Sequence, residues 1–318
     1  MLSRDWLLVE TLVEGDVSTV VAAGAHPRHW SGLGSLRRIL GPALATSAVQ
    51  AVQQCRSGES QRVVSGDTVV VAEPVSCAFG GVHGVQLWAG PADAPIPPRR
   101  RVAAWDWEAD TELAHHGPGL EELVFARSPD QVQVIRTPPE AFGAMTRFDG
   151  RLDYFAMVAR LHEGGQWQGE VDMVGDDDQV RHFQMITRAR PAHRRISALM
   201  HAIPELDTAK PATDPDVAML RAVSQRSGVG VGIIELTSAL IYEWAGPPPP
   251  PLDRWLVQRP VIDPDDLSAL RAACRELDPG TVARLKLRVQ FADGEPITAQ
   301  AELVAMSTGH GLLRVWSE

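Results

Sequence analysis

The sequence has 318 residues, of which 44% are hydrophobic and 22% are charged, and its formal net charge is −10. This length suits two or three domains of about 100 residues each, and the hydrophobic share excludes a disordered chain. The negative charge argues against nucleic acid as a partner, because phosphate binding requires a concentrated basic surface. The basic run at residues 99–101 lies in a proline-rich segment and is interpreted as a solvated linker.

The three cysteines, Cys55, Cys77 and Cys274, form no C-x-x-C pair. Their number suits a reducing cytoplasm and offers no framework for a metal, so we predict no metal site and leave the cofactor unknown. Charged residues interrupt the apolar N-terminus and argue against a signal peptide. No apolar run approaches the roughly 20 residues needed to span a bilayer. We therefore expect a cytoplasmic protein with no membrane partner.

The first predicted module covers residues 1–95 and has the element order of a PAS module, with two strands, short helices and three strands. The helical pattern includes Pro42, which suits the first position of a helix that ends at Ser57-Gly58. Alternation of apolar and polar residues and turn signals define the strands. The strands are expected at residues 5–12, 17–23, 61–64, 68–74 and 82–88.

A linker is predicted at residues 90–101, which contain four prolines and no periodicity. The second module, residues 102–190, begins with Trp105-Asp106-Trp107, and prolines and glycines interrupt its front half. Its back half contains an apolar-rich segment at 153–162. Two strands joined by a hairpin follow, at residues 166–174 and 179–188.

A helical connector is predicted at residues 191–227. Ile196, Leu199, Met200 and Ile203 fall at i, i+3, i+4 and i+7, the spacing of one helical face. We expect this stripe to pack against a module or a second copy of itself and to fix the orientation of the modules.

The third module covers residues 228–318, with a helix that starts at Asp263-Pro264. Its last strand ends Leu313-Arg314-Val315-Trp316, an echo of Val85-Gln86-Leu87-Trp88 in the first module. The predicted fold class is therefore α+β, with three tandem PAS/GAF-like modules that each form an antiparallel sheet with helices on one face. Strands are expected at residues 228–236, 238–244, 284–291, 297–306 and 310–316.

Several of these segments resemble a family of mycobacterial and related actinobacterial triple sensor-domain proteins. The matching segments are residues 5–12, the strand ending at Trp88 with Ala89-Gly90-Pro91-Ala92-Asp93 after it, and the closing Leu-Leu-Arg-Val-Trp. In that family a GAF-type domain lies between two PAS-type domains and no output enzyme is attached. The resemblance implies a cytoplasmic signalling or ligand-sensing role and supplies no catalytic residues.

No motif in the chain predicts an active site. The run Gly228-Val229-Gly230-Val231-Gly232 matches neither a dinucleotide loop nor a P-loop and is interpreted as the start of a strand. The pairs His26/His29 and His115/His116 lack a cysteine or acidic partner at ligand spacing, so structural or surface roles are favoured. The run Asp176-Asp177-Asp178 lacks the later glutamate of a calcium loop.

Trp30, Trp244 and Trp255 fall where the pocket of a PAS module, or its rim, would lie. Their large apolar area and donor N–H suit a bound ligand, and they are our candidate ligand-pocket residues. The alternative is that they fill the small cores of their modules.

Two functions remain open. The first is a non-enzymatic sensor that binds a small-molecule ligand or a partner protein, with the partner supplying the output. The second is an enzyme with an unrecognised site in the middle module. A polar cleft with convergent carboxylates or histidines favours the enzyme, whereas an apolar pocket favours the sensor. The sequence identifies neither the ligand nor the oligomeric state, and it is compatible with a homo-oligomer.

Overall fold

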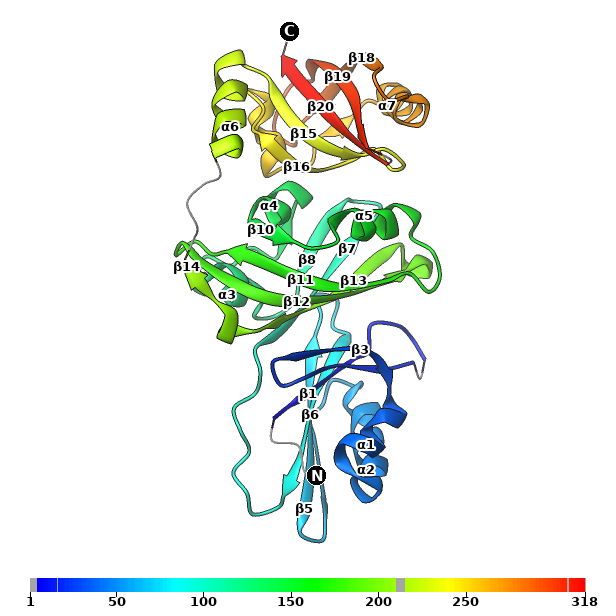
Figure 1. The fold of residues 1–318 in the computed structure, drawn as a ribbon. Coiled ribbons are helices and arrows are strands. Elements are labelled where there is room, and N and C mark those ends of the chain that lie inside the picture. Colours follow the sequence, from blue (N-terminus) through cyan, green and yellow to red (C-terminus); the bar gives the residue numbers. More distant parts are fainter. Residues whose placement is uncertain (1–4, 16, 210–214, 308, 318) are drawn as a thin grey trace.

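The chain folds into three units that follow one another along the length of the molecule, as the computed structural model shows (Figure 1). The structure describes residues 5–15, 17–209, 215–307 and 309–317. Each unit contains one antiparallel sheet, which confirms the predicted α+β class. We call residues 5–91 the first unit, residues 102–209 the middle unit and residues 215–317 the third unit.

In the first unit, two helices cover one face of a six-stranded sheet of order β3-β2-β1-β6-β5-β4. The elements are β1 (Leu7–Glu10), β2 (Thr19–Ala23), β3 (His26–Gly32), α1 (Leu36–Leu40), α2 (Pro42–Cys55), β4 (Gln61–Ser65), β5 (Thr68–Ser76) and β6 (Val82–Pro91). Pro42 begins α2, where its missing N–H costs no hydrogen bond. The predicted helices and strands are confirmed, and β3 is an addition.

The middle unit has an eight-stranded sheet of order β10-β11-β12-β13-β7-β8-β9, and β14 pairs with β12. Its strands are β7 (Val102–Glu108), β8 (Leu113–His116), β9 (Ile135–Arg136), β10 (Met145–Phe148), β11 (Gln166–Val174), β12 (Gln179–Arg190), β13 (Arg195–Ala202) and β14 (Thr208–Ala209). Its helices are α3 (Leu120–Phe125), α4 (Pro138–Gly143) and α5 (Arg151–Arg160). The apolar-rich segment at 153–162 thus forms most of α5.

The prediction of a helical connector over residues 191–227 is wrong in its first half. Residues 195–202 form β13, which pairs with β12 and β7 at the centre of the middle sheet. Ile196 and Met200 face the core of the middle unit, whereas Leu199 faces the first unit. Because this strand is buried on both faces, its apolar residues do not alternate and their spacing imitates a helix. The middle unit therefore extends to residue 209 rather than 190.

The second half of that connector is a helix, α6 (Pro215–Ser227), and residues 210–214 lie outside the described residues. The third unit continues as a six-stranded sheet of order β16-β15-β20-β19-β18-β17. The Asp263 side chain accepts a hydrogen bond from Asp265 N and caps α7 at the predicted start. The elements are β15 (Gly230–Glu235), β16 (Leu240–Gly246), β17 (Val261–Ile262), α7 (Pro264–Glu276), β18 (Val282–Gln290), β19 (Ile297–Ser307) and β20 (His310–Ser317).

All three sheets share one strand plan. In each, the first strand lies between the second strand and the last strand, which in the middle sheet is β13 when β14 is left out. A meander continues on the other side of the last strand. The shared plan accounts for the echo between the strands ending at Trp88 and Trp316, since β6 and β20 occupy the same place in their sheets.

The first and middle units pack sheet against sheet. Leu8 and Val21 of the first unit share one apolar cluster with Ile186 and Leu199 of the middle unit. The approach of the two backbones is close: a Cβ added at Gly117 would lie 2.8 Å from both the Ser76 and Ala104 carbonyl oxygens. The middle unit therefore buries part of the sheet face that the helices leave uncovered, and the rest of that face carries a separate cluster around Trp6 and Trp88.

The segment predicted as a linker also contacts both units. Trp6 Nε1 donates a hydrogen bond to Pro97 O at 2.9 Å, and Arg100 bonds Asp5 at 2.7 Å and Glu205 at 2.6 Å. Arg99 pairs with Glu73 at 3.3 Å. These arginines therefore pair with acidic groups of the protein itself, which agrees with a linker rather than a basic binding patch.

His201 makes the stability of the junction dependent on pH. Its side chain is buried beside Gln184, and burial, followed by the charge of Arg100, lowers its pKa to about 4 from 6.5. The unfolded chain therefore binds more protons between these pH values, so the free energy of unfolding falls as the pH falls through this window. We expect His201→Gln to reduce that fall by up to about 3 kcal/mol. Urea denaturation from pH 7 to 4 measures it, and an equal fall in both proteins would contradict the assignment.

Among the described residues, no helix is both long and apolar enough to cross a membrane.

Candidate ligand site

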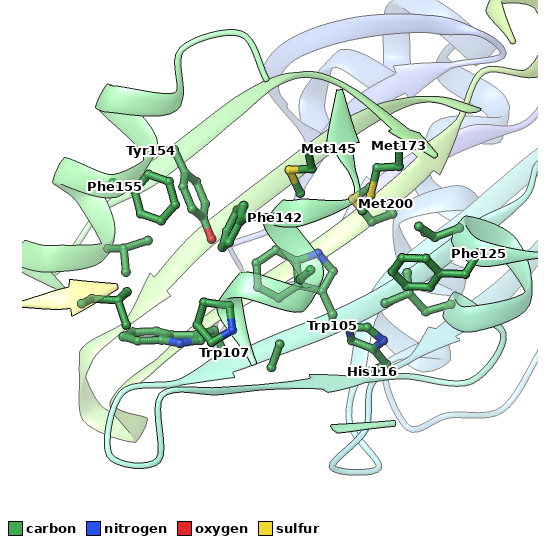
Figure 2. Close-up of a pocket in the computed structure, with 17 residues that line it drawn as sticks. Trp105, Trp107, His116, Phe125, Phe142, Met145, Tyr154, Phe155, Met173 and Met200 are labelled. Atoms are coloured by element: carbon green, nitrogen blue, oxygen red, sulfur yellow. The ribbon is translucent and has the colours of Figure 1, made fainter. Parts of the chain in front are cut away.

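The middle unit contains an apolar cavity between its sheet and the helices α3, α4 and α5 (Figure 2). Strand β7 directs Trp105 and Trp107 to this side, because alternate residues of a strand face the same way. The other aromatic and sulfur-containing residues of the wall are Phe125, Phe142, Met145, Tyr154, Phe155, Met173 and Met200.

The unfilled volume of the cavity is about 40 Å³. That space exceeds the roughly 10–15 Å³ that one water requires, yet a larger guest needs side chains to move. Three methionines line the cavity, and their unbranched side chains adapt to irregular shapes more readily than other core residues. We therefore expect a guest to be accommodated by rotation of these side chains.

The indole of Trp107 supplies an unused hydrogen-bond donor in this wall. The side chain is buried, and its Nε1 has no hydrogen-bond partner among the described residues. A buried donor without a partner costs about 1–3 kcal/mol. A guest with one acceptor oxygen would recover that cost.

A buried network of charges bounds the cavity at His116. Glu121 is fully buried on α3 and accepts hydrogen bonds from His116 Nδ1 at 2.6 Å, Arg127 at 2.7 Å and Arg136 at 2.7 Å. Burial disfavours the charged form of Glu121, but the bonds to His116 and Arg127 outweigh burial and keep the pKa of Glu121 below its ordinary value. The titratable groups beside the cavity thus form hydrogen bonds and ion pairs with one another, as in a network that stabilises the fold.

The third unit closes the cavity on another side. Leu240 of β16 lines it, and Tyr242 stacks on Phe155 with 3.7 Å between ring centroids. Two polar contacts also join the middle unit to the third unit: Arg151 pairs with Glu243 at 2.6 Å, and Thr137 Oγ1 donates a hydrogen bond to Leu256 O at 2.8 Å. A change in the shape of the cavity would therefore reach the third unit directly.

The three tryptophans predicted from the sequence lie elsewhere, and the structure does not bring them together. Trp244 and Trp255 contact each other edge to face, with centroids 5.6 Å apart, in the core of the third unit. Trp30 lies at the junction of the first and middle units, where the Arg188 guanidinium is 4.2 Å from its ring centroid. None of the three lines the apolar cavity. Two border surface hollows, Trp255 between the middle and third units and Trp30 beside β11.

The other histidine, glycine and aspartate candidates named from the sequence lie at the surface, at the start of a strand or in ion pairs. His26 and His29 are exposed on β3, and Gly230 begins β15. Asp176 pairs with Arg127, and Asp177 pairs with Arg181.

The cavity cannot be recognised in the sequence, because its wall comes from elements spread over residues 105–240. One signal was present: Trp105 and Trp107 alternate on a strand, and four aromatic residues follow within residues 142–155.

The family model described as Rv3651-like, N-terminal, matches residues 5–98. A crystal structure of an uncharacterized protein from Mycobacterium tuberculosis resembles the whole chain, with 21% identity, a TM-score of 0.76, and 99% of this chain and 96% of that chain covered. An RNA-binding light-oxygen-voltage receptor is 12% identical, with a TM-score of 0.27 over 68% of this chain and 95% of its own. A TM-score this low does not indicate a shared fold. No curated protein matches the chain.

Proposed function

We propose that this protein is a non-enzymatic cytoplasmic sensor whose middle unit binds a small, largely apolar molecule with one hydrogen-bond acceptor. The observation that carries the proposal is the unpaired, buried Nε1 of Trp107 in the wall of an otherwise apolar cavity. Such pockets, apolar with a few polar groups that fix orientation, are typical of small-molecule sites.

The shared strand plan supports a sensor architecture. In the first and third units the order, counted without the additional strands β3 and β17, is 2-1-5-4-3, as in PAS modules. We propose that these two units are PAS-like and that the middle unit, with its larger sheet, is GAF-like. The contact between Tyr242 and Phe155 provides a route by which occupancy of the cavity alters the third unit and, through it, a partner protein that supplies the output.

The alternative, an enzyme with its site in the middle unit, has less support. Its discriminating feature is a polar cleft with convergent carboxylates or histidines. The histidine in the cavity wall is His116, and its Nδ1 bonds the carboxylate of Glu121, which two arginines also hold. This carboxylate has three hydrogen-bond donors around it and does not line the apolar cavity.

The experiment is a titration of the full chain with cyclohexanone, a compact apolar molecule with one acceptor oxygen, followed by calorimetry. We expect saturable binding at one site, and we expect Trp107→Phe to bind about 2- to 10-fold more weakly, since a neutral hydrogen bond contributes about 0.5–1.5 kcal/mol. Trp107→Phe also enlarges the cavity, so cyclohexane, which has no acceptor, serves as the reference. The ratio of the cyclohexanone affinity to the cyclohexane affinity should fall about 2- to 10-fold in the variant.

Trp244→Phe is the matched control, because Trp244 Nε1 is also buried without a partner but lies outside the cavity. Its affinity for cyclohexanone should equal that of the unchanged protein. Absence of saturable binding, or an unchanged ratio of the two affinities in Trp107→Phe, would contradict the proposal.

A further inference from the structure

Three side chains with metal-binding atoms meet at the junction of the first and middle units. Cys77 directly follows β5, His83 lies on β6, and Asp106 lies on β7 of the neighbouring unit. All three are buried, with 5%, 3% and 1% of their surface exposed. The Cys77 sulfur, a His83 ring nitrogen and an Asp106 carboxylate oxygen all lie within 4.8 Å of one another.

One oxygen of this cluster has no partner. Asp106 Oδ1 accepts hydrogen bonds from His83 Nε2 at 2.8 Å and from Ser197 Oγ at 2.6 Å. Asp106 Oδ2 is buried and has no hydrogen bond within the described residues. A buried carboxylate oxygen left unsatisfied is costly, and a bound cation would satisfy it.

We propose that Cys77, His83 and Asp106 bind a divalent transition metal, with zinc best suited to the donors, and that this metal joins the first unit to the middle unit. A thiolate, an imidazole and a carboxylate are all zinc ligands. The two negative charges of the thiolate and the carboxylate would neutralise the charge of the ion in this buried place.

The separations fit a tetrahedral ion with small movements. Bond lengths of 2.0–2.3 Å place the donors of a tetrahedral zinc site about 3.3–3.8 Å apart. The contact between His83 and Asp106 would therefore lengthen by roughly half an ångström when the metal enters.

His115 lies beside this cluster but outside the group of atoms within 4.8 Å of one another, so it would have to move to supply a fourth donor. It lies directly opposite Asp106 in the pairing of β7 with β8, so the two side chains share a face of the sheet. Its Nε2 is buried, has no hydrogen-bond partner among the described residues and lies 3.9 Å from Glu108 Oε2, and its ring contacts Phe79, in the turn that holds Cys77, with 5.0 Å between centroids.

The competing account is a hydrogen-bonded network without metal. In that network, burial lowers the pKa of His83, but the bonds to Asp106 and Cys77 outweigh burial and raise the pKa to about 9. This account leaves Asp106 Oδ2 unpaired and predicts no stoichiometric uptake of metal.

A metal here would also be linked to the ligand cavity. Asp106 faces the junction, whereas its neighbours Trp105 and Trp107 on the same strand face the cavity. A shift of β7 on metal binding would therefore move both indoles, so the metal site could tune the cavity without contact with its guest.

The test is to strip the full chain with a chelator and titrate it with Co²⁺, both in the native state and during refolding from urea. We expect one equivalent to produce a thiolate-to-metal charge-transfer band. We expect Cys77→Ser to lose this band and Asp106→Asn to weaken binding. Ser197→Ala removes the hydrogen bond that orients the Asp106 carboxylate but keeps all three metal-binding atoms, and it should weaken binding about 10- to 100-fold.

Cys274→Ser is the matched control, because Cys274 is also buried but lies in the core of the third unit. It should retain the band and the affinity. If Cys77→Ser does not fold, Ser197→Ala and Asp106→Asn decide the question. Absence of a one-equivalent band in the unchanged protein would overturn the proposal, and so would a band of equal affinity in the junction variants.

Discussion

Replacing Glu121 by glutamine is expected to lower the free energy of unfolding by about 3–5 kcal/mol. The carboxylate is fully buried and bonds His116, Arg127 and Arg136 at 2.6–2.7 Å. Arg136 is itself almost fully buried, and loss of the Glu121 charge leaves its guanidinium with one carboxylate partner, Glu140 at 2.7 Å. The amide of glutamine also presents a donor where every neighbour is a donor.

Equilibrium denaturation in urea measures this change. Asp176→Asn is the control, because it removes the exposed partner of the same Arg127 and should cost less than about 1 kcal/mol. A loss below 1 kcal/mol in Glu121→Gln would show that the network does not hold the middle unit together.

Replacing Glu10 by glutamine has the second large expected effect, a loss of about 3–5 kcal/mol in the free energy of unfolding. Glu10 is fully buried in the first unit and accepts hydrogen bonds from Arg188 Nη2 of the middle unit at 2.8 Å, from Thr19 Oγ1 at 2.7 Å and from Leu12 N at 3.0 Å. The variant removes the carboxylate partner of the largely buried Arg188 and leaves Gln166 Oε1 at 2.6 Å as a neutral acceptor, so the two units should separate more readily than they unfold.

Two readouts distinguish a loosened junction from general destabilisation. The unchanged protein should unfold its first and middle units in one transition, whereas Glu10→Gln should show two. Glu14→Gln is the control, because Glu14 is an exposed carboxylate, 74% accessible, that pairs with Arg190 and His193 across the same junction. It should leave the single transition and its midpoint unchanged. A single transition of unchanged midpoint in Glu10→Gln would contradict the junction described above.

The first unit could be predicted almost element by element. Its strands alternate or end at turns, and α2 has a proline at its start and Ser57-Gly58 just beyond its end. These are local signals, and local signals survive in a single sequence.

The middle unit could not be predicted in the same way. β13 is buried on both faces and therefore lacks the period of a strand. Glu10 and Arg188 form a buried pair across 178 positions, but in the sequence each is merely a charge within an apolar run. The cavity and the Cys77 cluster could not be predicted for the same reason, because they depend on which faces of distant strands meet.

The central claim is that the cavity of the middle unit accepts a small apolar guest, and methyl NMR tests it most directly. The chain contains eight methionines, of which Met145, Met173 and Met200 line the cavity. With the methionine methyl groups labelled with carbon-13, cyclohexanone should shift these three resonances, which Met→Leu variants would assign. Cyclohexanone should leave the methyl resonance of Met306, which is exposed in the third unit, unchanged. Unchanged resonances of all three lining methionines at saturating cyclohexanone, or equal shifts throughout the chain, would contradict the claim.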